Sequence, residues 1–318
     1  MRHVGLLVLG SFINSLGTGL TAFGLAVIML RAHGTASSVA VIQMSAFAPL
    51  VLLAPLAGVL ADRYDRRLMM IIGDAGSVLG LGLILAALSS SRPSLAWVCA
   101  GAVLSSCLAA LTEPALRASV TDLVTEEDYV RSSGLLQLAS AAKYLLAPAA
   151  AGFLMPLVGV RGLVLLDAST CLVTVGCTMT VRRALAAGAS QRAAAQPGDD
   201  HDVLAGWRTI TASPGLRTLV ALMTLATLAI GVIQVLIKPI LLPTVSTTEM
   251  GVVETVAATG MLVGAALVTA WKSAQPTTLL AAGLAGTGVA MVLVPLGPGA
   301  WWVAACGFLT FACLPLSQ

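Results

Sequence analysis

The chain has 318 residues, of which 58% are apolar and only 10% charged. A water-soluble protein carries about 25% charged residues, so this composition leaves too little polar surface for a soluble particle. It excludes a soluble enzyme and a disordered chain, and a net charge of +3 provides no basic field for nucleic acid. The six cysteines form no CxxC pair and lie in apolar runs, which predicts neither disulfides nor a metal site.

Long stretches without Asp, Glu, Lys or Arg predict helices that cross a membrane. A helix needs about 20 apolar residues to cross the hydrocarbon core, and these runs are continuous rather than alternating, which disfavours a β-barrel. The first run is too long for a signal-peptide core and lacks a cleavage site, so we expect a retained first helix. The ten predicted helices cover residues 4–30, 38–60, 68–90, 94–114, 131–156, 161–182, 216–241, 250–271, 277–296 and 299–316.

Lysine and arginine are unevenly distributed between the predicted loops. With the N-terminus inside, the outer loops hold three of them, Arg31, Arg92 and Arg161. The inner loops hold twelve: Arg2, Arg63, Arg66, Arg67, Arg117, Arg131, Arg182, Arg183, Arg192, Arg208, Arg217 and Lys272. Because short cytoplasmic loops carry the excess of positive charge, we expect a multi-pass protein of the inner or plasma membrane with a cytoplasmic N-terminus.

The predicted helices fall into two groups separated by a polar stretch. We expect an N-terminal six-helix half over residues 1–182, a cytoplasmic linker over 183–215 and a C-terminal half with four helices over 216–318. An interfacial helix is expected in the linker at Val203–Ala212. Helix starts in the two groups correspond at a nearly constant offset, which is typical of parallel transporter repeats. A full second copy would hold two more helices, so we expect a shortened chain, with a complete ten-helix protein as the alternative.

The loop between the second and third predicted helices carries the most specific motif. Its sequence is Gly58-Val59-Leu60-Ala61-Asp62-Arg63-Tyr64-Asp65-Arg66-Arg67-Leu68. It resembles the signature loop of the major facilitator superfamily, Gly-x-Leu-Ala-Asp-Arg-x-Gly-Arg-Lys/Arg, with Asp65 in place of a glycine. The Asp-Arg-x-Asp-Arg-Arg form is similar to the exporter branch that includes macrolide and siderophore efflux proteins. Further stretches that resemble this branch are Pro114-Ala115, Leu123–Glu127, Ala147–Gly152, Asp167-Ala168-Ser169 and Ser213–Arg217.

The resemblance implies an all-α membrane protein, a major-facilitator-type bundle of two helical halves with six plus four transmembrane helices. In the family the loop acts as a latch that holds the halves in the outward-open state. The expected gating residues are Gly58, Asp62, Arg63, Arg66, Arg67 and Asp74. The residues themselves allow close helix approach at Gly58, pairing of Asp62 with an arginine, and binding of the arginines to the anionic leaflet at about 1 kcal/mol each. A simple topology anchor is the alternative.

Charged residues at membrane depth are costly, and each is a functional candidate by default. These candidates are Asp74, Glu113, Lys143, Asp167, Lys238 and Glu254. Asp74 lies about two turns into its helix, so we expect it at the inner gate with Arg63 or Arg66, with substrate contact as the alternative. Glu113 is expected to be an interfacial charge paired with Arg117 rather than a buried one.

A possible substrate or proton pathway is marked by Lys143, Pro148, Asp167, Gln234, Lys238 and Glu254. Lys143 is predicted near mid-membrane in the helix over 131–156. There it would line the substrate cavity or take part in coupling transport to the driving ion. In the same helix Ala147-Pro148-Ala149-x-x-Gly152 resembles the exporter antiporter motif, with an ordinary kinked helix as the alternative.

The other members of this set are predicted nearer the ends of their helices or are uncharged. Asp167 is predicted near the outer end of its helix, where a carboxylate is stabilised by snorkelling or by the helix N-terminus. Lys238 and Glu254 could form a pair across an outer cavity, although Lys238 could also snorkel. Gln234 could line the cavity or form hydrogen bonds between helices.

The residues alone indicate a polytopic helical protein with a sparsely charged interior. The resemblance implies a secondary active exporter of small amphipathic molecules, driven by proton antiport, with a small-molecule substrate, protons and the lipid bilayer as partners. The alternative is a truncated, non-transporting remnant of such an exporter. No Walker, HExxH or GxSxG motif is present, so we expect neither ATP hydrolysis nor enzymatic activity and no cofactor.

Overall fold

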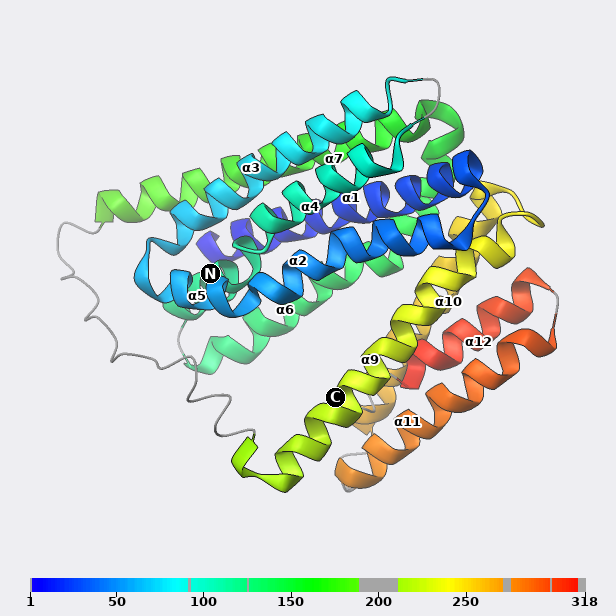
Figure 1. Ribbon diagram of the computed structural model, residues 1–318. Coiled ribbons are helices and arrows are strands. Elements are labelled where there is room, and N and C mark those ends of the chain that lie inside the picture. Colours follow the sequence, from blue (N-terminus) through cyan, green and yellow to red (C-terminus); the bar gives the residue numbers. More distant parts are fainter. Residues whose placement is uncertain are drawn as a thin grey trace. The chain divides into compact units, whose positions relative to one another are not determined.

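The computed structural model describes residues 2–90, 93–124, 126–188, 211–270, 276–297 and 299–313, which form helices and no strand (Figure 1). Contacts divide the chain into two compact units. Unit 1 comprises Met1–Lys143 and Val158–Val203, and unit 2 comprises Tyr144–Leu157 and Leu204–Gln318. Residues 144–157, which the sequence assigns to the N-terminal half, therefore make their contacts with the C-terminal part of the chain.

The helices of the N-terminal region follow the uncharged stretches of the sequence. They are α1 Arg2–His33, α2 Ala36–Arg63, α3 Arg66–Ala87, α4 Leu95–Ala109, α5 Thr112–Leu123, α6 Glu126–Leu145 and α7 Ala147–Gly188. In unit 1, α2 packs against α1 and α4, and α3 packs along α4 (Figure 1). Arg161 of α7 donates from Nε and Nη2 to the carbonyl of Leu88, at 3.0 and 2.6 Å, and so satisfies a carbonyl at the end of α3.

Small residues bring α3 and α4 into close contact. A methyl group on Gly80 would lie 2.6 Å from the Gly101 oxygen, and one on Gly101 would lie 2.8 Å from the Gly80 oxygen. The Ser77 hydroxyl donates across the same interface to the Ser105 carbonyl at 3.2 Å. Close backbone approach at small residues is the usual way in which membrane helices associate. This contact holds α3, and with it Asp74, in the interior of unit 1.

Two of the predicted helices are each interrupted. The stretch over 94–114 is divided at Ala110-Leu111 into α4 and α5, and Pro114 stands in the first turn of α5, where proline is tolerated. The stretch over 131–156 is divided at Leu146, and Pro148 is the second residue of α7. The single helix predicted over 131–156 is therefore wrong, whereas the one over 94–114 lies within the candidate span Leu95–Leu123, with a turn at Ala110-Leu111. Apolar composition does not reveal these breaks, because the residues at them, Ala110, Leu111 and Leu146, are themselves apolar.

The sixth predicted helix, 161–182, lies inside the 42-residue α7. At Gly159 the backbone adopts φ 68° and ψ 177°, so the helix axis changes there. A positive φ favours glycine, which has no Cβ to clash with the backbone. This glycine lies next to the boundary at Val158 where the chain passes from unit 2 back to unit 1.

Unit 2 contains the remaining described helices. They are α9 Pro214–Leu241, α10 Thr247–Ala270, α11 Pro276–Leu293, the short 3-10 helix η2 Val294–Leu296 and α12 Ala300–Cys313. α12 packs against α10 and α11 (Figure 1). The Gly260 Cα approaches the Phe308 carbonyl so closely that a methyl group would overlap it. Ser213 begins α9 by accepting a hydrogen bond from the Leu216 N–H at 3.4 Å, as N-cap serines do.

Six candidate membrane spans occur among the described residues. They are His3–His33, Ala36–Arg63, Arg66–Ala87, Leu95–Leu123, Ala147–Leu185 and Thr247–Leu267. Two shorter apolar helices, Ala282–Leu296 and Ala300–Cys313, follow them. The interfacial helix predicted at Val203–Ala212 lies outside the described residues except for its last two positions. The division into six plus four transmembrane helices stays a prediction.

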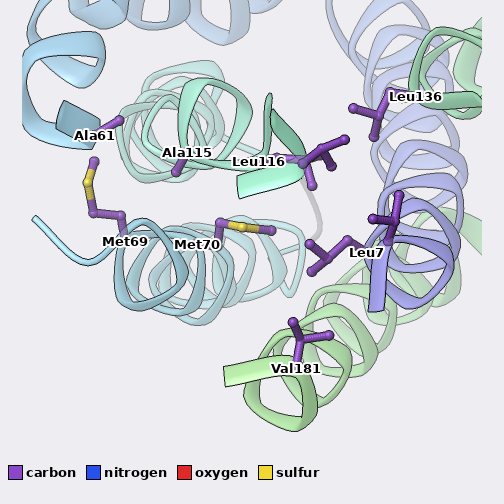
Figure 2. Packing of buried hydrophobic residues seen from close by; sticks show 10 residues of the cluster. Leu7, Ala61, Met69, Met70, Ala115, Leu116, Leu136 and Val181 are labelled. Carbon is purple, nitrogen blue, oxygen red and sulfur yellow. The ribbon is translucent and has the colours of Figure 1, made fainter. Parts of the chain in front are cut away.

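A hydrophobic cluster joins one end of most helices of unit 1. Its buried members are Val4, Leu7, Ala61, Met69, Met70, Ala115, Leu116, Val120, Leu136 and Val181. Figure 2 shows Met69 and Met70 of α3 beside Ala115 and Leu116 of α5. Because the cluster includes the last turn of α2 and the first turn of α3, it fixes the position of the loop between them.

Candidate functional site

Arg66 connects the α2–α3 loop to α5. Its Nη1 lies 2.6 Å from Asp122 Oδ1 and donates to the Ala118 carbonyl at 3.1 Å. Its Nε donates to the Ala61 carbonyl at 3.1 Å. The guanidinium therefore satisfies carbonyls near the ends of two helices and one carboxylate, a set of donors that a lysine could not reproduce. This is the central interaction of the gating loop predicted from the sequence.

Asp65, which replaces the glycine of the signature loop, has two functions in the structure. Its Oδ1 accepts hydrogen bonds from the N–H groups of Arg67 and Leu68, at 3.0 and 3.4 Å, and so caps α3. Its Oδ2 lies 3.0 Å from Arg182 Nε, near the end of α7. The loop is thus tied to both α5 and α7. Sequence reasoning missed Asp122 and Arg182 as partners, because both lie far away along the chain.

The other predicted gating residues take less part in this network. Asp62 is 58% exposed at its side chain and lies 4.0 Å from Arg66. Among the described residues of unit 1, no atom of another helix lies within 4 Å of a Cβ built on Gly58, so this unit shows no close helix approach there. Arg63 is the last residue of α2. The Nε of Arg67 is buried and has no hydrogen-bond partner among the described residues.

Asp74 is not paired with an arginine of the loop, in contrast to the expectation from the sequence. It is 1% exposed in the middle of unit 1 and accepts a hydrogen bond from the Thr112 hydroxyl at 3.0 Å. Arg66 instead points toward α5 and Asp122, which lie outside the buried interior. The reason is that the break before Thr112 places its hydroxyl beside α3, a contact that helical periodicity alone does not predict.

The ion pair predicted between Glu113 and Arg117 is confirmed. Their charged atoms lie 2.8 Å apart within α5, and each side chain is 53% exposed. Residues four apart on a helix are neighbours, so this pair follows directly from the sequence. Its exposure assigns it to the surface of unit 1 rather than to a buried site.

The break at Leu146 changes the environment expected for Lys143. This lysine stands in the last turn of α6, and its side chain is half-buried. The carbonyl groups at a helix C-terminus carry partial negative charge and favour a cation. Pro148 is buried at the start of α7, three residues after α6 ends. An ammonium buried in the middle of a helix would lack this interaction. The C-terminal end of α6 therefore offsets part of the free-energy cost of burying the Lys143 charge.

The beginning of α7 packs tightly against α10 within unit 2. The Gly251 Cα approaches the Pro148 carbonyl, and a methyl group on Gly152 would lie 2.8 Å from the Thr247 oxygen. Thr248 Oγ1 donates to the Gly152 carbonyl at 2.9 Å, and Thr255 Oγ1 accepts from the Ala149 N–H at 3.1 Å. The hydroxyl of Thr255 thus bonds an N–H at the start of a helix, where no partner exists within the helix.

Lys238 and Glu254 form an ion pair, one of the two alternatives that the sequence analysis gave for Lys238. Lys238 Nζ of α9 lies 2.8 Å from Glu254 Oε1 of α10. The two side chains are only 9% and 14% exposed. Gln234 lies one turn before Lys238 in α9, but its side chain lies outside the described residues. The pair introduces compensated charge into an otherwise apolar part of unit 2.

Asp167 is buried in the contact between α7 and α1. It is 4% exposed, and a methyl group on Gly17 would lie 2.7 Å from its Oδ1. The snorkelling predicted for Asp167 is therefore not found: it lies beside the middle of the 32-residue α1. The physical reason is that Gly17 leaves space on α1 for a side chain of α7 to be covered by protein.

Comparison with known proteins identifies the fold. A sequence profile described as the Major Facilitator Superfamily matches residues 7–318. No match is found among curated protein sequences.

Several solved transporters share the architecture. A bacterial homologue of the iron transporter ferroportin, in an inward-facing state, is 16% identical with a TM-score of 0.71, over 99% of this chain and 81% of that one. A bacterial homologue of the human lysosomal transporter Spinster, inward-facing and occupied, is 15% identical with a TM-score of 0.69, over 99% and 72%. A POT family transporter in complex with a thioalcohol-conjugated peptide is 12% identical with a TM-score of 0.68, over 99% and 82%.

Proposed function

Because this chain belongs to the Major Facilitator Superfamily, a family of membrane transporters, we propose that it exports small amphipathic molecules by proton antiport. The observation that carries the proposal is the network at the α2–α3 loop. Arg66 joins the loop to Asp122, and Asp65 joins it to Arg182. A loop tied to two helices of unit 1 moves with that unit, as a gating latch must.

The interior offers contacts that suit a substrate of mixed polarity. The protein is 58% apolar and 10% charged, and the Lys238–Glu254 pair is compensated. A polyanionic substrate would need several cations at one place, because buried charges must be paired. An amphipathic molecule with one charge matches the few charged groups available, and Lys143 is the proposed contact.

Protons are the proposed driving ion. The sequence contains no Walker motif, so ATP is not the direct source of energy. The membrane-spanning helices α3 and α7 each contain a buried carboxyl, Asp74 and Asp167, that forms no ion pair among the described residues. Carboxyl groups within transmembrane segments are the usual carriers in proton relays.

The proposed topology places the N-terminus, the 183–215 linker and residue 318 on the cytoplasmic side. It rests on the excess of lysine and arginine in alternate loops. Reporter fusions after Gly198 and Gln318 should both give the signal of the inside. An outside signal from either fusion would contradict the assignment.

The direct test is transport in lipid vesicles that contain the protein and an imposed pH gradient. We expect a panel of lipophilic cations and neutral drugs to include compounds that move against their gradient and, in doing so, collapse the pH gradient. The control is the Arg66→Ala variant, inserted at the same density. Substrate transport that does not depend on the pH gradient would contradict proton antiport. If no compound were transported, the non-transporting alternative would be favoured.

A further inference from the structure

We propose that Asp167 is a proton-binding site, and that a proton bound there allows α1 to pack against α7 at Gly17. This inference rests on the proposed proton antiport and deepens it by naming the group that binds the proton. It also states what protonation changes in the structure: the packing of α1 against α7, two helices of unit 1.

The contact between α1 and α7 repeats along both helices. On α1, Gly10, Asn14, Gly17, Thr21 and Gly24 recur every three or four residues and so share one face. A methyl group on Gly10 would lie 3.3 Å from Thr174 Cγ2, and one on Gly24 would lie 3.0 Å from Leu163 Cδ1. We call this contact, from Gly10 to Gly24 on α1 and from Leu163 to Thr174 on α7, the α1–α7 seam. Asp167 stands in the middle of it.

Within the α1–α7 seam, Asn14, Cys171 and Thr174 have hydrogen-bond partners, whereas the buried Thr21 hydroxyl has none among the described residues. Thr174 Oγ1 donates to the Gly10 and Thr170 carbonyls at 3.2 and 2.9 Å. Cys171 Sγ donates to Asn14 Oδ1 at 3.4 Å. These bonds close the seam on the side of Asp167 that leads toward the start of α1. Water is therefore excluded from this side by side chains that already bond one another.

Asp167 differs from these neighbours because its charge is not compensated. The hydroxyls of Thr21 and Thr170 lie beside the carboxyl, but Oδ1 has no hydrogen-bond partner among the described residues. No ion pair involving Asp167 occurs in the described part of the chain. A buried carboxylate without a cation or water is strongly unfavourable, and the usual outcome is that the group takes up a proton. The closed seam therefore requires the neutral acid.

A proton fits this place better than a metal ion. Metal cations of the hard class need six or more oxygen ligands around them. Here one carboxyl lies among two hydroxyls, and the Gly17 backbone occupies the space in front of Oδ1. No group of three or more His, Cys, Asp or Glu side chains suitable for a metal occurs in the described ranges.

The titratable groups near Asp167 are few. On its own helix, the Cys171 thiol lies one turn away, and it lies within electrostatic reach of both Asp167 and Asp74 of α3. The face of α1 that packs against Asp167 presents Asn14, Gly17 and Thr21, none of which titrates. None of the groups that face Asp167 from α1 or from Cys171 thus supplies a positive charge that would compensate a carboxylate.

Release of the proton then has a structural consequence. The step is the loss of H⁺ from the carboxylic acid to water, which leaves a carboxylate on Asp167. This anion needs water or a cation, and neither has space while Gly17 lies against it. Ionisation of Asp167 and closure of the α1–α7 seam therefore exclude each other. Release of the proton is thus coupled to separation of the two helices, and binding of the proton to closure of the α1–α7 seam.

Infrared difference spectroscopy of the full protein in lipid vesicles tests the site directly. Protonated carboxyls have a C=O stretching band separate from that of carboxylates. We expect a band at neutral pH that disappears at alkaline pH in the wild type, and whose Asp167 component is missing in Asp167→Asn. The control is Glu113→Gln, which removes an exposed carboxyl and should leave the band unchanged. A band that is identical in wild type and Asp167→Asn at every pH would overturn the proposal.

A pair of glycine variants tests the coupling to the α1–α7 seam. In Gly17→Ala the new methyl group would press on Asp167 and Thr170, so the seam cannot close. We expect the acid band of Asp167 to be lost at neutral pH although the residue is still present. Gly82→Ala is the matched control, because no atom lies within 4 Å of its new methyl group. An unchanged acid band in a folded Gly17→Ala protein would contradict the coupling, and Asp167→Asn still tests the site if Gly17→Ala does not fold.

The same preparations separate this inference from the proposed function. Proton-coupled export without an Asp167 acid band would overturn the inference and leave antiport intact. An Asp167 band in a protein whose transport ignores the pH gradient would overturn antiport and leave the assignment of the proton site intact. The infrared measurement needs no substrate, so it does not depend on identifying one.

Discussion

The ammonium of Lys238 on α9 lies 2.8 Å from the carboxylate of Glu254 on α10, and both side chains are almost fully covered. Each charge alone would be expensive to bury in an apolar helical unit, whereas the pair compensates both. Since α9 and α10 are joined by a short connection, the pair also fixes how these two helices face each other. This relationship leads to a prediction about stability that does not require a known substrate.

We expect Lys238→Met to lower the free energy of unfolding by about 3 kcal/mol, because it leaves the Glu254 charge buried and unpaired. The double variant Lys238→Met, Glu254→Gln should recover most of this loss, since it buries no net charge. Thermal unfolding in lipid nanodiscs measures both. If the double variant were as unstable as the single one, Lys238 would stabilise the protein through its packing rather than through the pair.

The α2–α3 loop should respond unequally to substitution of Arg66 and of Asp62, two of its charged residues. Arg66→Ala removes three contacts, to Asp122, Ala118 and Ala61, and should destabilise unit 1 by on the order of 1 kcal/mol, since the pair with Asp122 is partly exposed. Asp62→Asn should leave stability unchanged, because Asp62 is exposed and lies 4.0 Å from Arg66. Both should reduce transport without preventing insertion, which vesicle transport and quantitative blotting measure. Normal transport by both variants would leave the loop as a topology anchor only.

Lys143→Met should insert normally and change stability by less than about 1 kcal/mol, because the favourable interaction with the end of α6 and the cost of burial oppose each other. We expect impaired export or an altered dependence of export on pH. Vesicle transport across a pH series measures this, with Lys143→Arg as the charge-preserving control. Transport equal to the wild type at every pH would mean that Lys143 has only a structural role.

The contact between α7 and α10 should not tolerate a side chain at Gly251. In Gly251→Ala the methyl group would overlap the Pro148 carbonyl, which is backbone and cannot rotate away. Overpacking of this kind costs about 1–3 kcal/mol. The exposed Gly288→Ala, with no atom within 4 Å, is the control and should be neutral or slightly stabilising, since alanine favours helices. Equal melting temperatures for the two variants would show that the helices separate easily here.

The features that the sequence predicts correctly are local ones. Glu113 and Arg117 stand four residues apart on one helix, so their pairing requires only helical geometry. The apolar runs predict the positions of most helices, because crossing a membrane demands continuous hydrophobicity. The α2–α3 loop is recognisable because its charged residues are adjacent in the chain.

The remaining features depend on which helix lies against which, and this is decided by packing between distant segments. Asp65 has its partner in Arg182, and Asp74 bonds Thr112 rather than an arginine of the loop. The same holds for Asp167, whose burial requires that a glycine of α1 lie opposite it. By itself the sequence determined that the chain spans a membrane and carries its charges at few places. The tertiary structure decided which of those charges are paired, because the energy of a buried charge depends on its neighbours in space.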